Sequence, residues 1–390
     1  MKQAWMQVIS LVLVAVSVVN KSGALDFGVK QQVLNKLIEN GNNSKVSTPV
    51  STSVYIKTHK TASTTITNIF FKNAFRAKQK IGLVPDPTLS YLAGYPESHI
   101  SKIYPKDQNL DGIYDHVRFH PDLLKRISGQ PKFVTSIREP FSHSKSVFTF
   151  FEKDQPFLRF GGSIEKFYKN KNGWVDKLKG SKKSNSKIYK LKNYQAFDLG
   201  WQNESSLFQP DYDYSWHGGV VERFLKVINE VFDLIIVTDR LVESLVAVSV
   251  LMGWRAEDVC LGSFYEQEKT TSEQNGGTVE NEKNGNNVTN LQKSILEWNS
   301  IDSKLYELSV SKLDTFISQN RNVFDAKMKK YEFVCTNCKH YVKITPGEFL
   351  AKLRSGGEFS ECEERGFTPK QWGIGHFRDN CTETGVFSPL

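Results

Sequence analysis

The chain contains 390 residues, of which 39% are hydrophobic and 24% charged, and its formal net charge is +9. A chain of this length can bury a sizeable core, and we expect one large domain with appendages rather than two equal domains. The positive balance suits an anionic ligand. No nucleic-acid recognition motif accompanies it, so nucleic acid is not an expected partner.

The N-terminal residues 1–21 carry an apolar run from Trp5 to Val19. This run is short for a membrane-spanning helix and also fits the core of a signal peptide, cleaved after Ala24. Both alternatives, a signal anchor and a cleaved signal, place the rest of the chain in the secretory lumen. Residues 22–51 are predicted to form a stem. Four glycosylation sequons agree with a lumenal location: Asn42, Asn203, Asn287 and Asn380.

A strand, a turn and a helix are predicted between Val54 and Ala74. The run from Val54 to Ile56 is typical of a buried strand, and helical apolar spacing begins at Thr64. Free N–H groups and the helix dipole at such a junction bind phosphate or sulfate, and Lys60 would add a positive charge. The loop lacks the glycines of a Walker A sequence, so an N-capped helix with an exposed lysine is the alternative. The candidate anion-binding residues are Lys60, Thr61, Ala62, Ser63, Thr64 and Thr65.

A second strand-to-helix junction is predicted in residues 133–148. The apolar strand leads into Arg138 at its carboxyl end, and Pro140 marks the turn into a helix. Ser146 would lie about two turns into that helix. An arginine fork with a serine hydroxyl suits a phosphate monoester, whereas the alternative pairs Arg138 with Glu139 or another carboxylate.

The middle of the chain offers weaker signals. Residues 166–192 are rich in lysine with aromatic residues between, which fits a heparin or nucleic-acid patch, but we favour a solvated surface segment. In residues 193–200, Gln195 and Asp198 are candidates for contacts with substrate hydroxyls. The alternative is a structural turn that Asp198 caps.

Further periodic segments indicate an α/β fold with a central parallel sheet covered by helices. A third strand is expected at residues 234–237, followed by an apolar helix from Leu241 to Leu251 that Gly253 ends. Residues 267–290 lack periodicity and are predicted to be a disordered insertion. Helical spacing returns from Leu291 to Val323, as one long helix or a helical pair.

Most cysteines lie in a C-terminal appendage predicted at residues 331–390. A zinc ribbon would be the interpretation for a cytosolic chain, but in an oxidising lumen disulfides are favoured. Cys335 with Cys338 and Cys362 with Cys381 is one of the pairings open to them. In that pairing Cys260 remains a buried thiol or an intermolecular partner.

The two junctions together resemble the cofactor motifs of the galactose-3-O-sulfotransferase family, which includes galactosylceramide sulfotransferase. Lys57 to Thr65 resembles the loop for the 5′-phosphosulfate of 3′-phosphoadenosine 5′-phosphosulfate (PAPS). Arg138-Glu139-Pro140 with Ser146 resembles the 3′-phosphate motif. With three further matching stretches, the similarity spans residues 52–262 and thins out on both sides. It implies a sulfotransferase domain at 52–330 with a P-loop-like phosphosulfate loop.

The sequence departs from the family at two places. Thr64-Thr65 stands where a Ser-Thr pair is expected, a change that keeps both hydroxyls. The stretch Phe-Ser-His-Ser-Lys between Pro140 and Ser146 is unlike typical members, which leaves the adenine-side contacts open.

The resemblance implies a role for each motif residue. Lys60 would stabilise charge on the leaving phosphate, the backbone and hydroxyls from Thr61 to Thr65 would cradle the phosphosulfate, and Arg138 and Ser146 would hold the 3′-phosphate. Sulfuryl transfer also needs a base, for which His116 is the first choice, in competition with His59 and His120. No metal is expected.

The function implied is transfer of a sulfuryl group from PAPS to a galactose hydroxyl, O3, of a glycolipid such as galactosylceramide or of a glycoprotein glycan. The resemblance also implies a Golgi membrane protein, single-pass and type II, with a lumenal catalytic domain; secretion after signal cleavage is the alternative. Two other functions stay open: a glycosaminoglycan uronyl 2-O-sulfotransferase and a non-catalytic lumenal glycan-binding protein.

Overall fold

The structure is a computed structural model of the chain, which divides into two units, Met1–Thr48 and Pro49–Leu390. All described residues belong to the second unit, so the predicted anchor at 1–21, the stem at 22–51 and most of the appendage lie outside them. No helix in the described part of the chain has the length and apolar character to cross a membrane. The structure describes residues 52–77, 79–82, 103, 109–151, 163–173, 190, 192–201, 219–261 and 285–337.

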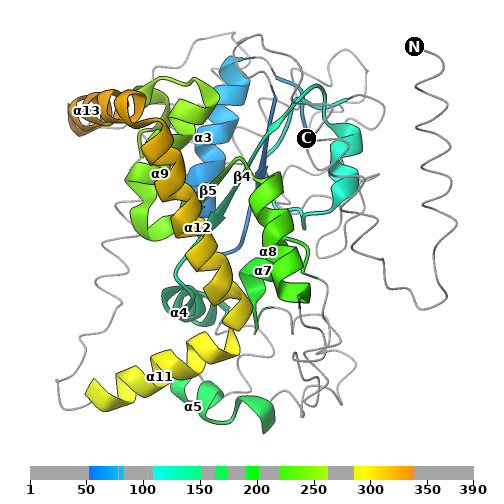
Figure 1. Cartoon of the computed structure of the whole chain (residues 1–390), viewed down its shortest axis with the longest axis vertical. Coiled ribbons are helices and arrows are strands. Elements are labelled where there is room, and N and C mark those ends of the chain that lie inside the picture. Colours follow the sequence, from blue (N-terminus) through cyan, green and yellow to red (C-terminus); the bar gives the residue numbers. More distant parts are fainter. Residues whose placement is uncertain are drawn as a thin grey trace, which may run out of the picture. The chain divides into compact units, whose positions relative to one another are not determined.

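The centre of the fold is a five-stranded sheet in which every pairing is parallel (Figure 1). The predicted parallel sheet is therefore confirmed, as are its three strands with long apolar runs. The other two strands have only two residues each, too short to give a periodic signal. In spatial order the strands are β2 (Ile81–Gly82), β3 (Gly112–Ile113), β1 (Ser53–Ile56), β4 (Lys132–Ile137) and β5 (Leu234–Val237).

Helices follow the three longer strands and pack against the sheet, and α12 runs along it in front of β5 (Figure 1). The described α-helices are α3 (Ser63–Arg76), α4 (Pro140–Phe151), α5 (Ile164–Lys169), α7 (Tyr194–Asp198), α8 (Val220–Val231), α9 (Leu241–Met252), α11 (Gly285–Trp298), α12 (Ser300–Gln319) and α13 (Arg321–Asn337). The 3-10 helices are η3 (Pro121–Arg126), η8 (Thr238–Arg240) and η9 (Ala256–Val259).

Two helical predictions need correction. Helix α11 begins at Gly285, so the last part of the segment predicted as an aperiodic insertion, 267–290, is helical. The segment from Leu291 to Val323 is neither one helix nor a pair, because short breaks at Asn299 and Asn320 divide it among three helices. Helix α9 ends as predicted at Gly253, whose φ of 68° suits glycine.

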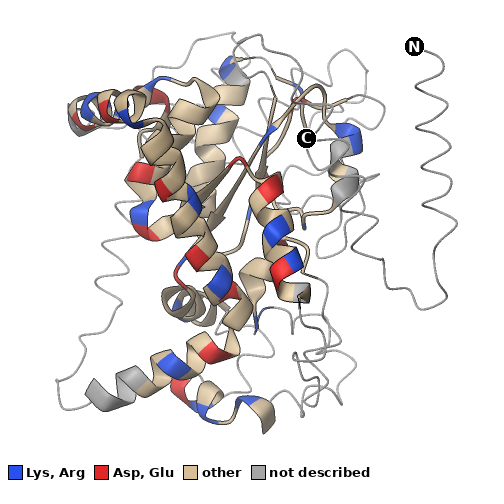
Figure 2. Cartoon of the chain, viewed as in Figure 1, with Lys and Arg blue, Asp and Glu red and all other residues tan. Residues whose placement is uncertain are grey.

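The core explains why the strand predictions succeeded. Both β1 and β5 are buried along their whole length, as parallel strands covered on both faces must be. Phe70 on α3 stacks on Tyr55 of β1, with ring centroids 5.1 Å apart. In the view of Figure 2 the strands carry few charges, whereas basic and acidic residues are interspersed along the helices.

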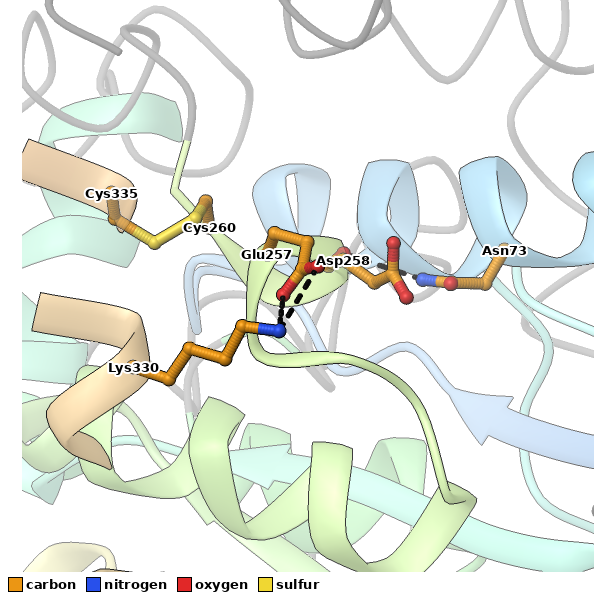
Figure 3. Close-up of a disulfide and its surroundings, with 6 residues drawn as sticks. All are labelled: Asn73, Glu257, Asp258, Cys260, Lys330 and Cys335. Atoms are coloured by element: carbon orange, nitrogen blue, oxygen red, sulfur yellow. Dashed lines mark hydrogen bonds and ion pairs between the residues drawn. A yellow bond between two sulfur atoms is a disulfide. The ribbon is translucent and has the colours of Figure 1, made fainter. Parts of the chain in front are cut away.

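A disulfide joins Cys260 to Cys335 (Figure 3). The pairing of Cys335 with Cys338 is therefore wrong, and Cys260 is not a free thiol. The physical reason is tertiary: α13 packs on η9, which ends just before Cys260, and the Cα atoms come within 5.5 Å. An ion pair between Lys330 and Glu257 of 3.2 Å holds the same two elements together. Cys362 and Cys381 lie outside the described residues.

We expect loss of this disulfide to destabilise the domain. It closes a loop of 75 residues, for which the chain-entropy model gives an upper value of about 4 kcal/mol. Cys260→Ser should lower the melting temperature of the full chain under non-reducing conditions, and the reduced wild type should lose a similar amount. Cys335→Ser should lower the melting temperature by the same amount, and the double variant by no more than either single variant, because the same bond is lost in each case. If the effects of the two single substitutions add in the double variant, the assigned bond is wrong.

Candidate functional site

The two predicted anion-binding loops meet at one end of the sheet. Strand β1 pairs with β4, and because the strands are parallel, the loops that follow them leave from the same edge. The guanidinium of Arg138 donates a hydrogen bond to the backbone carbonyl of Lys60 at 3.5 Å. Residues 78 positions apart in the chain thus form a single polar site.

The first loop has an unusual backbone. Lys60 and Ala62 have φ values of 59° and 53°. These values lie in the left-handed region, which residues other than Gly, Asn and Asp rarely adopt. Alternation of left-handed and ordinary residues turns successive N–H groups toward one side, which makes a concave binding site for anions. Helix α3 begins directly afterwards at Ser63, and its first-turn N–H groups have no acceptor within the helix.

A buried network of hydroxyls fixes this conformation. The Ser136 hydroxyl of β4 hydrogen-bonds to the hydroxyls of Tyr55 and Thr61, each at 2.7 Å. Thr58 bonds Thr61 at 2.8 Å and also donates to the backbone carbonyl of Ser136. These contacts bind the loop to the neighbouring strand, and they hold the two left-handed residues in place.

The network separates the predicted loop residues into two groups. Thr61 is fully buried, and its hydroxyl is engaged in the interior, so only its backbone remains for a ligand. Ser63 and Thr65 are also buried, at 6% and 7% exposure. Thr64 is exposed at the start of α3. The side chain of Thr64 is therefore the best placed hydroxyl of the loop.

Arg138 is oriented by the first turn of α4. Its Nε donates to the Ser142 hydroxyl at 3.2 Å. The carboxylate of Glu139 accepts the backbone N–H groups of Phe141 and Ser142, at 2.9 and 2.7 Å, and so caps the helix. Glu139 is thus engaged with the helix end rather than with the guanidinium.

The exposed side of α4 carries residues at intervals of one helical turn. Ser142, Ser146 and Phe150 are each four positions apart, a spacing that places side chains on one face of a helix. Phe150 is 63% exposed, and the ammonium of Lys60 lies 3.9 Å from its ring centroid. Ser142 and Phe150 were missed in the sequence. The four-residue spacing from Arg138 would have indicated them once the helix start was known.

Two candidate bases are stacked on each other. The His59 ring lies against the rings of His116 and Tyr194, with centroid distances of 4.0 and 4.8 Å. His59 is buried at 5% exposure, whereas His116 is half-buried. His120, the third candidate, directly precedes η3. His59, which precedes Lys60, and His116, which lies between the two predicted loops, therefore belong to one cluster.

His116 is held as a neutral base. Its Nδ1 lies 3.2 Å from the backbone carbonyl of Lys57. Because a carbonyl oxygen only accepts, the neutral ring carries its proton on Nδ1 and its lone pair on Nε2. Burial, with the charges of Lys57 and His59, holds the pKa of His116 well below 6.5. The imidazole is therefore unprotonated near neutral pH.

An ion pair is hydrogen-bonded to the backbone of His116. The Lys57 ammonium is 3.4 Å from the carboxylate of Asp115, which also accepts the backbone N–H of His116 at 2.8 Å. Burial raises the pKa of Asp115, and the charge of Lys57 opposes that rise. The pair thus fixes the backbone of His116 and contributes the positive charge that lowers the pKa of its ring.

Helix α7 contacts both loops. Gln195 and Asp198 are fully buried, and their partners are Arg138 and His59. Both side chains therefore have structural roles rather than contacts with substrate hydroxyls, and Asp198 binds His59 of the first loop instead of capping its own turn. The sequence signal was their three-residue spacing, which puts both on one side of a helical turn.

The described residues contain no group of three or more side chains suited to hold a metal ion. The donors brought together are an ammonium, a guanidinium, hydroxyls and backbone N–H groups. This set is suited to phosphate and sulfate oxygens.

Comparison with known proteins agrees with this chemistry. The model of the family described as galactose-3-O-sulfotransferase matches residues 3–321. Human galactose-3-O-sulfotransferase 3 is 25% identical over 66% of this chain and 54% of its own length. Bovine galactosylceramide sulfotransferase is 27% identical over 65% of this chain and 54% of its own. The chain spans about half the length of the curated relatives it matches. No solved structure matches it significantly.

Replacement of the buried threonine should affect stability more than replacement of the exposed one. Thr61→Val keeps the shape but removes the buried hydrogen bonds of the Thr61 hydroxyl to Ser136 and Thr58, which should cost about 1–3 kcal/mol in total. Thr64→Val, the matched control, should change the free energy of unfolding by less than about 0.5 kcal/mol. Denaturant titration of the full chain measures both. Equal effects would contradict the interior role of Thr61.

Proposed function

The chain belongs to the galactose-3-O-sulfotransferase family, and on that premise we propose that it transfers a sulfuryl group from PAPS to a galactose hydroxyl. The proposed position is O3, and the acceptor is a glycolipid such as galactosylceramide or a glycoprotein glycan. We further propose that the N-terminal segment anchors it in the Golgi membrane as a single-pass type II protein. One observation carries the proposal: Arg138 reaches the backbone of Lys60, so the two anion-binding loops form one site.

The residues present fit the two charged ends of the donor. Lys60, the turn from Lys60 to Ala62 and the first N–H groups of α3 would hold the 5′-phosphosulfate. Arg138, with the hydroxyl of Ser146, would hold the 3′-phosphate. Ser142 orients the guanidinium: its hydroxyl donates to the backbone carbonyl of Glu139 and accepts from Nε of Arg138.

The proposed reaction is an in-line displacement at sulfur. The acceptor oxygen forms a bond to sulfur while the bond from sulfur to the phosphate oxygen breaks, and 3′,5′-ADP leaves. His116 Nε2 takes the proton of the acceptor hydroxyl, and Lys60 stabilises the charge that develops on the leaving phosphate. His59 is too enclosed to reach an acceptor readily, and we assign it the role of orienting the His116 ring by stacking.

Sulfate transfer to a panel of acceptors tests the function. The full-length chain, supplied with radiolabelled PAPS, should sulfate terminal galactosides and not heparan fragments. Transfer to heparan uronyl residues alone would favour a uronyl 2-O-sulfotransferase. The relatives, which are named for galactose, do not favour that alternative.

Substitution of the two basic residues should weaken transfer in different ways. Lys60→Ala should lower kcat by about 10²–10³, because it removes charge stabilisation in the transition state. Arg138→Ala should chiefly raise the KM for PAPS, because it removes contacts present in both ground and transition states. Steady-state kinetics separates the two effects. A non-catalytic glycan-binding protein would show no transfer at all, and glycan binding would survive both substitutions.

His116→Gln should remove the base and lower kcat by about 10²–10⁴. His59→Gln, the matched control, should cost less because it disturbs only the orientation of that base. The wild-type rate should fall only at pH values below 6.5, since protonation inactivates the base and the pKa of His116 is lowered. If His59→Gln is the more damaging change and removes the acidic fall in rate, His59 is the base instead.

A further inference from the structure

Helix α7 is hydrogen-bonded to the backbone of both anion-binding loops. We propose that Gln195 and Asp198 form a clasp, which holds the two loops at the separation that one doubly charged donor requires. This inference rests on the proposed function. It concerns how the site is preorganised, and it assigns positioning roles to two residues that would not touch the donor.

Gln195 hydrogen-bonds to both the backbone N–H and the backbone carbonyl of Arg138 in the second loop. Its Oε1 accepts the backbone N–H of Arg138 at 2.8 Å, and its Nε2 donates to the backbone carbonyl of Arg138 at 3.0 Å. The side chain is fully buried, so water cannot replace either bond. The backbone from which the guanidinium projects is therefore fixed.

Asp198 binds the backbone N–H and the ring of His59 in the first loop. One carboxylate oxygen accepts the backbone N–H of His59 at 2.7 Å and lies 2.9 Å from Nδ1 of its ring. His143 of α4 donates from Nε2 to the backbone carbonyl of His59 at 2.9 Å. Both polar backbone groups of the residue before Lys60 are thus bound. Burial lowers the pKa of His143 to about 3, so this donor stays neutral.

The two contacts are mechanically linked because Gln195 and Asp198 are three positions apart on one helix. A movement of one loop relative to the other would have to break a buried hydrogen bond or deform α7. The Arg138–Lys60 contact alone, at 3.5 Å, is too long to impose this constraint.

Helix α7 is in turn hydrogen-bonded to the first turn of α12. The buried carboxylate of Asp302 accepts the backbone N–H groups of Gln195 and Ala196, at 3.3 and 2.8 Å. In return, the Asn193 side chain accepts the N–H of Ile301 at 3.1 Å. Helix α12 packs on β5 and β4. The position of the clasp is therefore fixed relative to the same sheet from which the two loops emerge.

Such a clasp has a specific consequence for binding. When two half-sites are held at the correct separation, binding of one end of a ligand places the other end at a high effective concentration. A ligand with both phosphates then gains far more affinity than either half alone. Loosening the clasp removes that gain but leaves each half-site able to bind its own phosphate.

The test compares 3′,5′-ADP with 3′-AMP and 5′-AMP by calorimetry on the full-length chain. The wild type should bind 3′,5′-ADP at least about 100-fold more tightly than either monophosphate. Gln195→Met, which is nearly isosteric and makes neither bond, should weaken 3′,5′-ADP binding about tenfold. Its affinities for the two monophosphates should stay close to the wild-type values.

Two further variants separate positioning from general destabilisation. Cys260→Ser lowers stability at a distance from the site and should leave all three affinities unchanged at a temperature where the chain is folded. Gln195→Glu places a buried carboxyl next to that of Asp302, whose pKa burial raises to about 7. The new carboxyl should therefore be protonated and keep both bonds to Arg138, so this variant should retain more affinity for 3′,5′-ADP than Gln195→Met.

The outcomes are distinguishable. If Gln195→Met binds 3′,5′-ADP as tightly as the wild type, or loses affinity equally for all three ligands, the clasp is refuted while the proposed function stands. If the wild type itself shows no preference for 3′,5′-ADP over the monophosphates, the proposed donor, and with it the function, is refuted.

Discussion

Parallel pairing of β1 with β4 is the constraint on which the candidate site depends. Because the two strands are neighbours and run in the same direction, the loops after Ile56 and Ile137 must emerge together. The contact between the two loops, the bond from Arg138 to the Lys60 carbonyl, follows from that placement. A single reversed or exchanged strand would separate the motifs, however well each matched its family pattern.

Around that edge the fold uses buried polar groups to impose geometry. The hydroxyls that meet at Ser136 hold a loop with two left-handed residues, and the Lys57–Asp115 pair fixes the backbone of a neutral histidine. Buried polar groups are costly unless each has a partner, so such networks tolerate few alternative arrangements. The rigidity suits the proposed transfer reaction, in which positioning and electrostatics would supply most of the catalysis.

The errors of sequence interpretation have a common cause. Cys335 was paired with the nearest cysteine, but α13 returns across η9 and meets Cys260, 75 residues away. Gln195 was considered for substrate contact, yet it binds a backbone 57 residues distant. Neither partner leaves a local pattern, because the contact is made only when helices that are remote in the chain pack together.

The sequence by itself determined the parallel α/β class, the three strands with continuous apolar runs, and the two strand-to-helix junctions with Lys60 and Arg138. These features depend on periodicity and on residue types at short range, which one chain displays directly. Only the tertiary structure decided that Thr61 faces the interior, that His59 stacks on His116 and that α7 joins the loops. Such decisions depend on which buried groups find partners across the fold, and that is fixed by packing rather than by spacing.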